Sequence, residues 1–155
     1  MDISSDEIVA MINSTRAGSV WEILDITLVS AEKDRVVATM PIGPHHLQQA
    51  GYLHGGISIT LAESIASLGT VLNIDASKQM AFGLEINANH LRPKRDGQLT
   101  GVATPIHRGR TTQVWDVQIT DENDKLICVS RCTIAVVNRP PDNGSPFARN
   151  VPSFG

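Results

Sequence analysis

The chain has 155 residues, which is enough for one ordinary domain with its own hydrophobic core and short for two. Hydrophobic residues make up 41% and charged residues 19%, a balance typical of globular proteins and not of disordered chains. Thirteen basic and sixteen acidic residues give a formal net charge of -3, so no overall positive field exists to hold a nucleic-acid backbone. The composition therefore argues against nucleic acid as a partner.

The N-terminal sequence MDISSDEIVAMINSTR has no apolar core of signal-peptide length, and no stretch approaches the run of about 20 apolar residues that a membrane span requires. We expect a cytoplasmic protein with no membrane partner. Cys128 and Cys132 lie in a predicted strand, about 13 Å apart at a rise of about 3.3 Å per residue. A disulfide joins Cα atoms no more than about 7 Å apart, so these thiols are not bonded to each other, which suits a reducing cytoplasm.

The first predicted element is a short helix in the segment DEIVAMINSTR. Ser4 lies before it, acidic residues occupy its first turn, apolar residues recur at helical spacing, and Gly18 ends it. Residues 21–30 and 35–40 are then rich in β-branched side chains, with a charged stretch at 31–34 between them. We interpret these segments as a first β-hairpin.

A loop with the sequence GPHHLQQAGYLHGG leads into ISITLAESIASLGTVLNI, eighteen residues with one charge. Such a helix is apolar on nearly every face, so we expect it to be buried all round. Four strand-like segments follow, separated by the turn-like sequences PKRDG, RGR and DENDK, at about residues 80–92, 97–107, 112–120 and 126–138. The predicted fold class is α+β, with an antiparallel sheet wrapped around one long central helix.

The predicted domain spans residues 1–138. Residues 139–155, with the sequence RPPDNGSPFARNVPSFG, are dense in Pro, Gly, Ser and Asn and show no periodicity. Because such a segment buries little apolar surface, we expect a disordered C-terminal tail.

Glu63 is the one charged side chain between His54 and Asp75, and an unpaired carboxylate on a buried helix is costly. Residues at i, i+3, i+4 and i+7 spacing form a polar stripe on one side of this helix, namely Thr60, Glu63, Ser64 and Ser67. A stripe of this kind is typical of a cavity wall, which makes Glu63 a candidate catalytic carboxylate. The alternative is that a hydrogen-bond network holds Glu63 as a brace for the core.

The sequence His54-Gly55-Gly56 marks the start of the same helix. Free backbone N–H groups and the positive end of the helix dipole suit a developing oxyanion there, although these glycines could instead serve close packing on the sheet. Gly55 and Glu63 are about 12 Å apart along a helix that rises about 1.5 Å per residue, so one carbonyl carbon cannot contact both. A two-fold dimer with antiparallel helices would bring Glu63 of one subunit opposite His54 and Gly55 of the other.

Other polar residues offer weaker signals. Four histidines lack the spacing of zinc sites, so no metal site is predicted: His45, His46, His54 and His90. Gln48 could orient a substrate carbonyl or a water molecule, or could simply be solvated. The basic clusters HLRPKR at 90–95 and RGR at 108–110 could hold phosphates, or could be the charged ends of strands.

Three stretches together resemble a known family: QQAGYLHGGISITLAESIASLGT, GLEINANHLRPKRDG and HRGRTTQVWDVQITDENDKLICVSRCT. They are similar to the hotdog-fold acyl-coenzyme A thioesterases, and within these to the aryl-coenzyme A branch, which includes 4-hydroxybenzoyl- and 1,4-dihydroxy-2-naphthoyl-coenzyme A thioesterases. The resemblance covers about residues 21–137. It implies the hotdog fold, thioester hydrolysis and a homotetramer built as a dimer of dimers, with the homodimer as the minimal active unit.

The resemblance also implies roles for individual residues. Glu63 is the expected nucleophile or general base, and the Gly55 N–H is the expected oxyanion donor. Gln48 and His54 match partners that position the carbonyl and assist the leaving group, and Ser67 matches a hydroxyl that assists at the site. The expected contacts of coenzyme A are His90 and Arg92 near the pantetheine arm and nucleotide, and Arg110 and Thr111 at the nucleotide phosphates.

The expected function is hydrolysis of an acyl-coenzyme A thioester, with an aromatic acyl group, to a free acid and coenzyme A. No cofactor is expected beyond the coenzyme A of the substrate. A hotdog dehydratase or hydratase is one alternative, although the Asp/His pair that it needs is not in place. A non-catalytic acyl-coenzyme A binding module is another, and it would have no use for Glu63. Aromatic and medium-chain fatty acyl groups would all meet apolar pocket walls, and small changes in such walls alter substrate preference only modestly.

Overall fold

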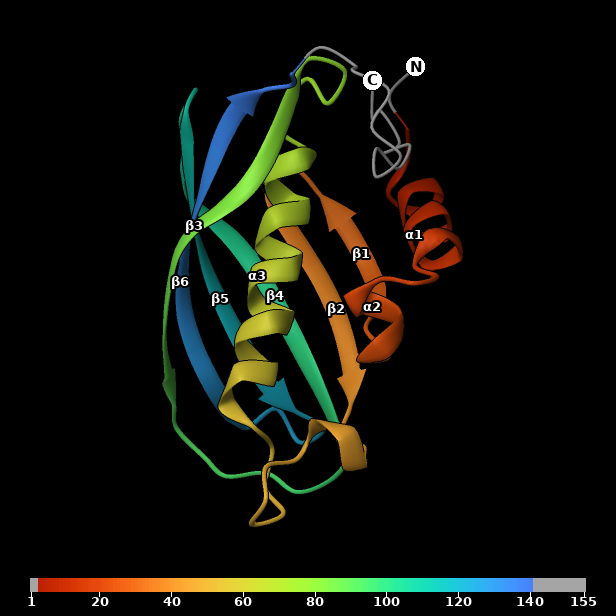
Figure 1. Cartoon of the computed structure of the whole chain (residues 1–155), viewed down its shortest axis with the longest axis vertical. Coiled ribbons are helices and arrows are strands. Elements are labelled where there is room, and N and C mark those ends of the chain that lie inside the picture. The colour runs from red at the N-terminus through yellow and green to blue at the C-terminus, as the bar shows by residue number, and fades with distance from the viewer. Residues whose placement is uncertain (1–2, 141–155) are drawn as a thin grey trace.

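The structure, a computed structural model, describes residues 3–140. Within this range six strands form one antiparallel sheet in the order β1-β2-β4-β5-β6-β3, and the sheet curves around the helix α3, Gly55–Val71 (Figure 1). The strands are β1 Thr27–Glu32, β2 Arg35–Pro41, β3 Gln79–His90, β4 Gln98–Arg108, β5 Thr112–Asp121 and β6 Leu126–Asn138. The predicted α+β hotdog architecture is confirmed. The predicted tail lies outside the described residues from residue 141 onward.

The N-terminal helix α1, Ser5–Thr15, begins where the sequence predicts it. The Ser4 hydroxyl accepts a hydrogen bond from the Glu7 N–H at 3.3 Å, and the Glu7 carboxylate accepts one from the Ser4 N–H at 2.9 Å. This reciprocal pair is a capping box, which satisfies two backbone donors at the helix start. The helix packs against β1 at the margin of the sheet (Figure 1).

The predicted first strand at residues 21–30 is wrong in its first half. A helical turn, α2 (Val20–Ile23), occupies this place, and β1 begins only at Thr27. The reason is local backbone geometry that β-branched composition does not reveal. Asp25 adopts a left-handed φ of 53°, and the Ile26 N–H closes the turn on the Trp21 carbonyl at 2.8 Å.

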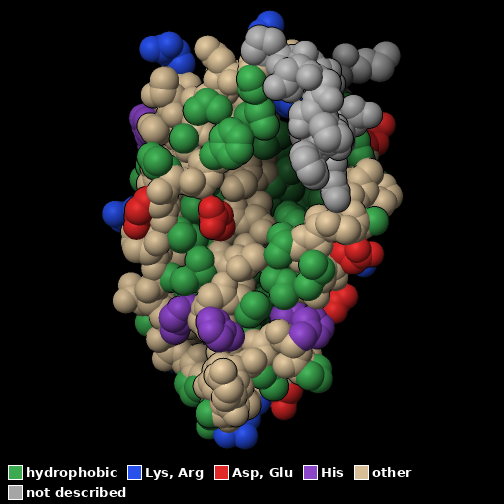
Figure 2. All heavy atoms as spheres, viewed as in Figure 1, with side chains coloured by type: hydrophobic (Ala, Val, Ile, Leu, Met, Phe, Trp, Pro, Cys, Tyr) green, Lys and Arg blue, Asp and Glu red, His purple; other side chains and the backbone are tan. Residues whose placement is uncertain are grey.

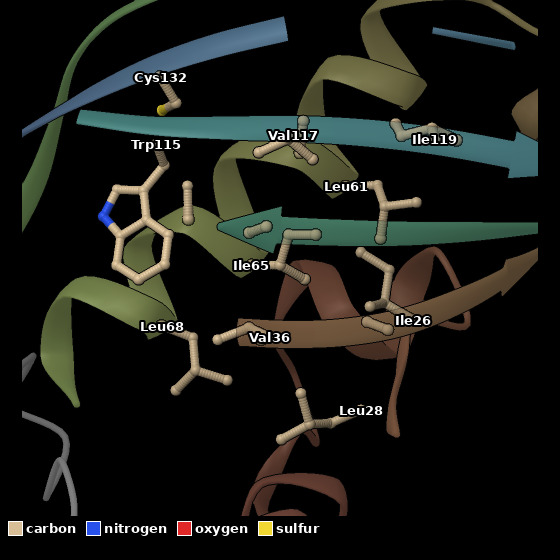
Figure 3. Packing of buried hydrophobic residues seen from close by; sticks show 14 of the residues in the cluster. Ile26, Leu28, Val36, Leu61, Ile65, Leu68, Trp115, Val117, Ile119 and Cys132 are labelled. Atoms are coloured by element: carbon tan, nitrogen blue, oxygen red, sulfur yellow. The ribbon is translucent and has the colours of Figure 1, made fainter. Parts of the chain in front are cut away.

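Apolar packing between α3 and the concave face of the sheet forms the core. Leu61, Ile65 and Leu68 on α3 contact side chains from β1, β2 and β5 (Figure 3). Full burial of each such side chain stabilises the fold by roughly 1.5–3 kcal/mol. The helix approaches β5 most closely at Gly69, where a Cβ atom would lie 2.5 Å from Cη2 of Trp115. The Trp115 indole N–H donates to the Thr70 hydroxyl on the next residue of α3 at 2.9 Å.

The expectation that α3 is buried all round is wrong for the single chain. The polar stripe of Thr60, Glu63, Ser64 and Ser67 is only partly buried, because the sheet covers one side of α3 and the opposite side faces outward (Figure 1). The helix contains many small uncharged side chains, which make it read as apolar in sequence. Such side chains can lie at a partly exposed surface, so no second layer has to cover them. The outward side of α3 is therefore available to a ligand or to another subunit.

Strand β3 lies at one edge of the sheet and pairs only with β6 in the described part of the chain. The register shifts between Gly83 and Glu85, and the neighbouring Phe82 and Leu84 are 51% and 65% exposed. An exposed apolar edge strand carries unpaired backbone groups that can bond to another chain. Such an edge is typical of a subunit interface.

Cys128 and Cys132 both lie on β6. Both thiols are free and buried, as predicted. Burial, followed by the negative charges of Glu63 and Glu85, raises the pKa of the Cys132 thiol to about 12.

Among residues 3–140, no helix has the length and apolar character needed to cross a bilayer.

Candidate active site

The start of α3 presents a free backbone donor. His54 caps the helix, and its Nδ1 accepts a hydrogen bond from the Gly56 N–H at 3.0 Å. The Gly55 N–H precedes the first intrahelical hydrogen bond and has no acceptor within residues 3–140. It therefore stands at the positive end of the helix dipole, ready to bind an oxygen that develops negative charge.

A cavity of about 540 Å³ opens beside this helix start. Five of the predicted site residues line it, namely Gln48, His54, Gly55, His90 and Arg92. The imidazole of His90, the last residue of β3, lies against Gly55, where a Cβ atom would come within 2.6 Å of its Nε2. Histidine side chains gather on this face of the molecule near the start of α3 (Figure 2).

Gln48 turns one end of its amide toward its own loop. Its Oε1 accepts a hydrogen bond from the Ala50 N–H, and its backbone N–H donates to the Tyr52 carbonyl at 2.8 Å. The Nε2 group has no acceptor in the described part of the chain and remains free to donate to a carbonyl oxygen in the cavity.

Glu63 lies at the middle of α3, away from this cavity. Its carboxylate rests on the backbone of Gly83 in β3, where a Cβ atom would overlap Oε1 and lie 2.9 Å from Cδ. It makes no hydrogen bond or ion pair with any residue between 3 and 140, so the alternative of a carboxylate held in a bracing network has no support here. A half-buried carboxylate without a partner is costly and is typical of functional sites.

The other members of the polar stripe do not engage Glu63. Thr60 donates its hydroxyl hydrogen to the Gly56 carbonyl at 2.8 Å. Ser67 lies one turn beyond Glu63 on the partly buried side of α3, and its hydroxyl makes no hydrogen bond to the residues described. The regular helix between Gly55 and Glu63 keeps these two groups about 12 Å apart, since each residue adds about 1.5 Å of rise.

The predicted coenzyme A contacts are divided between the two ends of α3. Arg110 and Thr111 form the turn between β4 and β5, near the C-terminal end of α3, where neighbouring Arg108 donates to the Asn73 side chain at 3.2 Å. The Thr111 carbonyl accepts from the Val136 N–H at 2.9 Å, and Arg110 is exposed. One subunit therefore does not bring this turn to His90 and Arg92, which line the cavity at the start of α3.

Within residues 3–140, the basic cluster after β3 contains one lysine that is paired with acidic side chains and two arginines that are not. Lys94 is 14% exposed in its side chain and bonds to Glu122 at 2.7 Å and Asp121 at 3.4 Å, so it acts as a structural charge. The hydrogen bond to Glu122 raises the pKa of Lys94 above its usual range. Arg92 donates one Nη to the Leu126 carbonyl at 2.7 Å, while Arg95 stacks over the Tyr52 ring at 4.1 Å. The two arginines retain donors for phosphate oxygens.

The histidines before α3 do not suggest a metal site. His46 is buried, where its Nδ1 accepts from the Gly43 N–H at 2.8 Å and its Nε2 donates to the Leu24 carbonyl at 3.1 Å. Its role is structural. No group of three or more His, Cys, Asp or Glu side chains within residues 3–140 is arranged to hold a metal ion.

Sequence reasoning overlooked two residues that belong to this region. Gly83 lies under the Glu63 carboxylate, and a glycine inside a strand is a known sign of close approach by another group. Ser58 lines the cavity and is 1% exposed, although its Oγ has no hydrogen-bond partner among the described residues. Its position among the sheet-facing apolar residues of α3 was the available signal.

The helix α3 thus carries a free N–H donor at its start and a carboxylate without a partner at its middle, within the described residues. Residues 50–128 match the model of the Thioesterase superfamily. The chain is 50% identical over 115 residues to a 1,4-dihydroxy-2-naphthoyl-CoA hydrolase of Listeria monocytogenes, which covers 74% of this chain and 93% of that protein. It is 42% identical over 126 residues to a hydrolase of the same name from Escherichia coli, at 81% and 92% coverage.

The structure is also similar to that of a variant of the thioesterase PA1618 from Pseudomonas aeruginosa, with a TM-score of 0.82 and 39% identity over 84% of this chain and 94% of that one. The chain belongs to the thioesterase superfamily and has the hotdog fold of its structural relatives. The resemblance of the sequence to this family is therefore confirmed, and so is the expected thioester hydrolase activity.

Proposed function

We propose that this protein hydrolyses an acyl-coenzyme A thioester that carries an aromatic acyl group, with Glu63 as the reacting carboxylate. The observation that carries the proposal is the Glu63 carboxylate itself, which is partly buried against Gly83 and has no partner in the described residues. The names of the two hydrolases reported above support an aromatic acyl group.

The proposed reaction adds water across the thioester and releases a carboxylic acid and a thiol. The Gly55 N–H polarises the carbonyl oxygen, and Glu63 either attacks the carbonyl carbon or removes a proton from the attacking water. Gln48 and His54 position the carbonyl and the leaving sulfur, and Ser67 assists beside Glu63. No cofactor takes part in the proposed reaction, because coenzyme A enters only as the leaving group of the substrate.

The proposed active unit is a homodimer with two composite sites. Within one subunit Gly55 and Glu63 are too far apart to act on one carbon, and a two-fold axis between antiparallel α3 helices brings Gly55 opposite the partner subunit's Glu63. The exposed β3 edge and its apolar Phe82 and Leu84 support pairing at this side of the molecule. We also propose that two such dimers form a homotetramer and that the protein works in the cytoplasm.

The same pairing accounts for the divided coenzyme A contacts. Antiparallel helices bring the C-terminal end of the partner's α3 close to the N-terminal end of this one, so the partner subunit's Arg110 and the partner's Thr111 approach His90 and Arg92. The nucleotide of one substrate would then contact both subunits.

The two alternative functions fit the site less well. A non-catalytic binding module would gain nothing from the unpaired Glu63, and a dehydratase would need an Asp/His pair at the site.

The experiment that tests the function measures free thiol released from an aromatic acyl-coenzyme A. Glu63→Gln keeps the size of the side chain but removes the base, so kcat should fall at least about a hundredfold. The matched control is Glu85→Gln, which alters a nearby exposed carboxylate on β3 and should retain parental activity. Near-parental turnover by Glu63→Gln would assign Glu63 a structural role and remove the proposed mechanism.

A further inference from the structure

Ser58 is a buried hydroxyl that the fold leaves without a partner. It lies one turn into α3, on the side that faces the sheet, and is 1% exposed. Its Oγ forms no hydrogen bond with any residue from 3 to 140. Most buried polar atoms in native proteins are bonded, so an unpaired hydroxyl in this place calls for a physical reason.

Packing alone does not provide that reason. Most other sheet-facing residues along α3 are apolar, including Leu61, Ala62 and Ile65, and the one other buried hydroxyl, that of Thr70, is bonded to the Trp115 indole N–H. Alanine at position 58 would fit the same space, has a higher helix propensity and leaves no polar atom to desolvate. The hydroxyl is thus a cost to the free protein, and the cost is offset when a ligand supplies the missing hydrogen-bond partner.

The cavity beside Ser58 indicates where such a ligand lies. Ser58 lines the same cavity as His90 and as Gly55, whose backbone N–H is a free donor. Three residues of helix separate Gly55 from Ser58, a rise of about 4.5 Å. The hydroxyl therefore lies about one helical turn from the place where the carbonyl oxygen of a thioester binds.

The chemistry of the proposed substrate matches this spacing. In an acyl-pantetheine thioester, the thioester carbon is joined through sulfur and two methylene groups to the first amide nitrogen. Four bonds of about 1.5–1.8 Å with tetrahedral angles span about 5 Å. An amide is also a suitable partner, because it offers both a donor and an acceptor to a hydroxyl.

We propose that Ser58 Oγ hydrogen-bonds the pantetheine amide nearest the sulfur and so selects thioesters of pantetheine-type thiols. The inference rests on the proposed thioesterase function and adds a residue that determines leaving-group specificity. Gly55 binds the carbonyl oxygen, Ser58 binds the amide one turn further along α3, and Arg92 lies at the same cavity with free donors for the phosphates beyond. Ser58 thereby favours substrates in which an amide lies at this distance from the thioester.

The test combines one substitution in the protein with one deletion in the substrate. A single aromatic acyl group is attached to N-acetylcysteamine, which retains the first amide, and to 1-pentanethiol, which has the same chain length without it. Ser58→Ala should lower kcat/KM for the N-acetylcysteamine thioester about fivefold to tenfold, the effect of one lost hydrogen bond, and change kcat/KM for the pentanethiol thioester less than about twofold. The acyl-coenzyme A substrate should follow the amide-bearing thioester.

Ser130→Ala is the matched control, because Ser130 is also a buried serine but lies on β6 and does not line the cavity. It should affect both substrates equally or not at all. Ser58→Ala should unfold at the same temperature as the parent protein or higher, since it removes an unpaired buried hydroxyl. A lower unfolding temperature would indicate a structural role and overturn the inference.

The outcomes separate the inference from the function on which it rests. If the parent protein releases thiol from neither thioester nor from acyl-coenzyme A, the proposed function fails. If the parent is active but Ser58→Ala lowers both short thioesters equally, or changes neither, the amide contact is refuted and the thioesterase function stands. An ordered water molecule on Ser58 as its sole partner would give this second result.

Discussion

The carboxylate of Glu63 on α3 lies directly on the backbone of Gly83 in β3, and no side chain larger than hydrogen fits between them. Gly83→Ala is therefore expected to displace the carboxylate, which can move because it is the flexible end of its side chain. Displacement of a reacting group by about 1 Å can cost about a hundredfold in rate, so kcat should fall by that order. Thermal unfolding should change little, since the atoms nearest the added Cβ belong to the flexible end of the Glu63 side chain.

Inhibition by free coenzyme A provides the control for Gly83→Ala. Gly83 does not line the cavity at the helix start, so the inhibition constant of coenzyme A should stay within about twofold of the parent value. Unchanged kcat in a folded Gly83→Ala protein would show that the carboxylate does not act from this position.

The shared site predicts that two inactive proteins restore activity when mixed. Glu63→Ala subunits lack the carboxylate, and Gly55→Pro subunits lack the donor N–H. In a mixed dimer one site carries both defects and the other carries none. After the two proteins are unfolded together and refolded, thiol release should reach roughly a quarter of the parent level, since random pairing gives half mixed dimers with one intact site each. Circular dichroism must first show that the proline variant folds.

The same geometry places the two-fold axis at a particular residue. If Gly55 faces the partner subunit's Glu63, the residue midway between them, the partly buried Ile59, faces its own copy. Ile59→Cys should therefore form a disulfide-linked dimer on mild oxidation, detected by non-reducing electrophoresis. Ser64→Cys serves as the control, because its copies would be about 15 Å apart along the helix axis, beyond the reach of a disulfide. Efficient cross-linking of Ser64→Cys instead would assign a different axis.

Part of this site was accessible from the sequence. The motif His54-Gly55-Gly56 and the isolated Glu63 specify chemistry by residue type, and helical rise alone gives their separation. Gly83 and Ser58 were missed because their roles depend on contacts between α3 and strands far away in the chain. The strand predicted at residues 21–30 failed for a similar reason, since β-branched composition carries no information on the left-handed turn at Asp25.

Arg92 and Arg110 are expected to act on the nucleotide of coenzyme A and not on the acyl group. Arg92→Ala and Arg110→Ala should each raise KM for acyl-coenzyme A, while KM for the corresponding acyl-pantetheine stays close to the parent value. Lys94→Ala is an informative comparison, because Lys94 is already bonded to Asp121 and Glu122. Equal losses on both substrates would leave the arginines with the ordinary role of charges near strand ends.

The cysteines should be inert in the folded protein. Burial raises the pKa of both thiols, and that of Cys132 reaches about 12 with added contributions from Glu63 and Glu85. Since the thiolate is the reactive form, both groups stay protonated at pH 8 and should react with a disulfide reagent only after unfolding in guanidinium. Glu63→Gln should leave Cys132 slow, because burial is the larger cause. Rapid labelling of native protein would contradict the buried location.

The contact between Gly69 and Trp115 sets the lengthwise position of α3 on the sheet. A slip of one residue would bring Leu68 or Thr70 against the indole in place of a hydrogen atom, and would break the bond between the indole N–H and the Thr70 hydroxyl. Six residues, about 9 Å of helix, separate Gly69 from Glu63. The contact between Gly69 and Trp115 therefore fixes where Glu63 lies along the sheet, so the position of the proposed reacting carboxylate depends on core packing about 9 Å away along the helix.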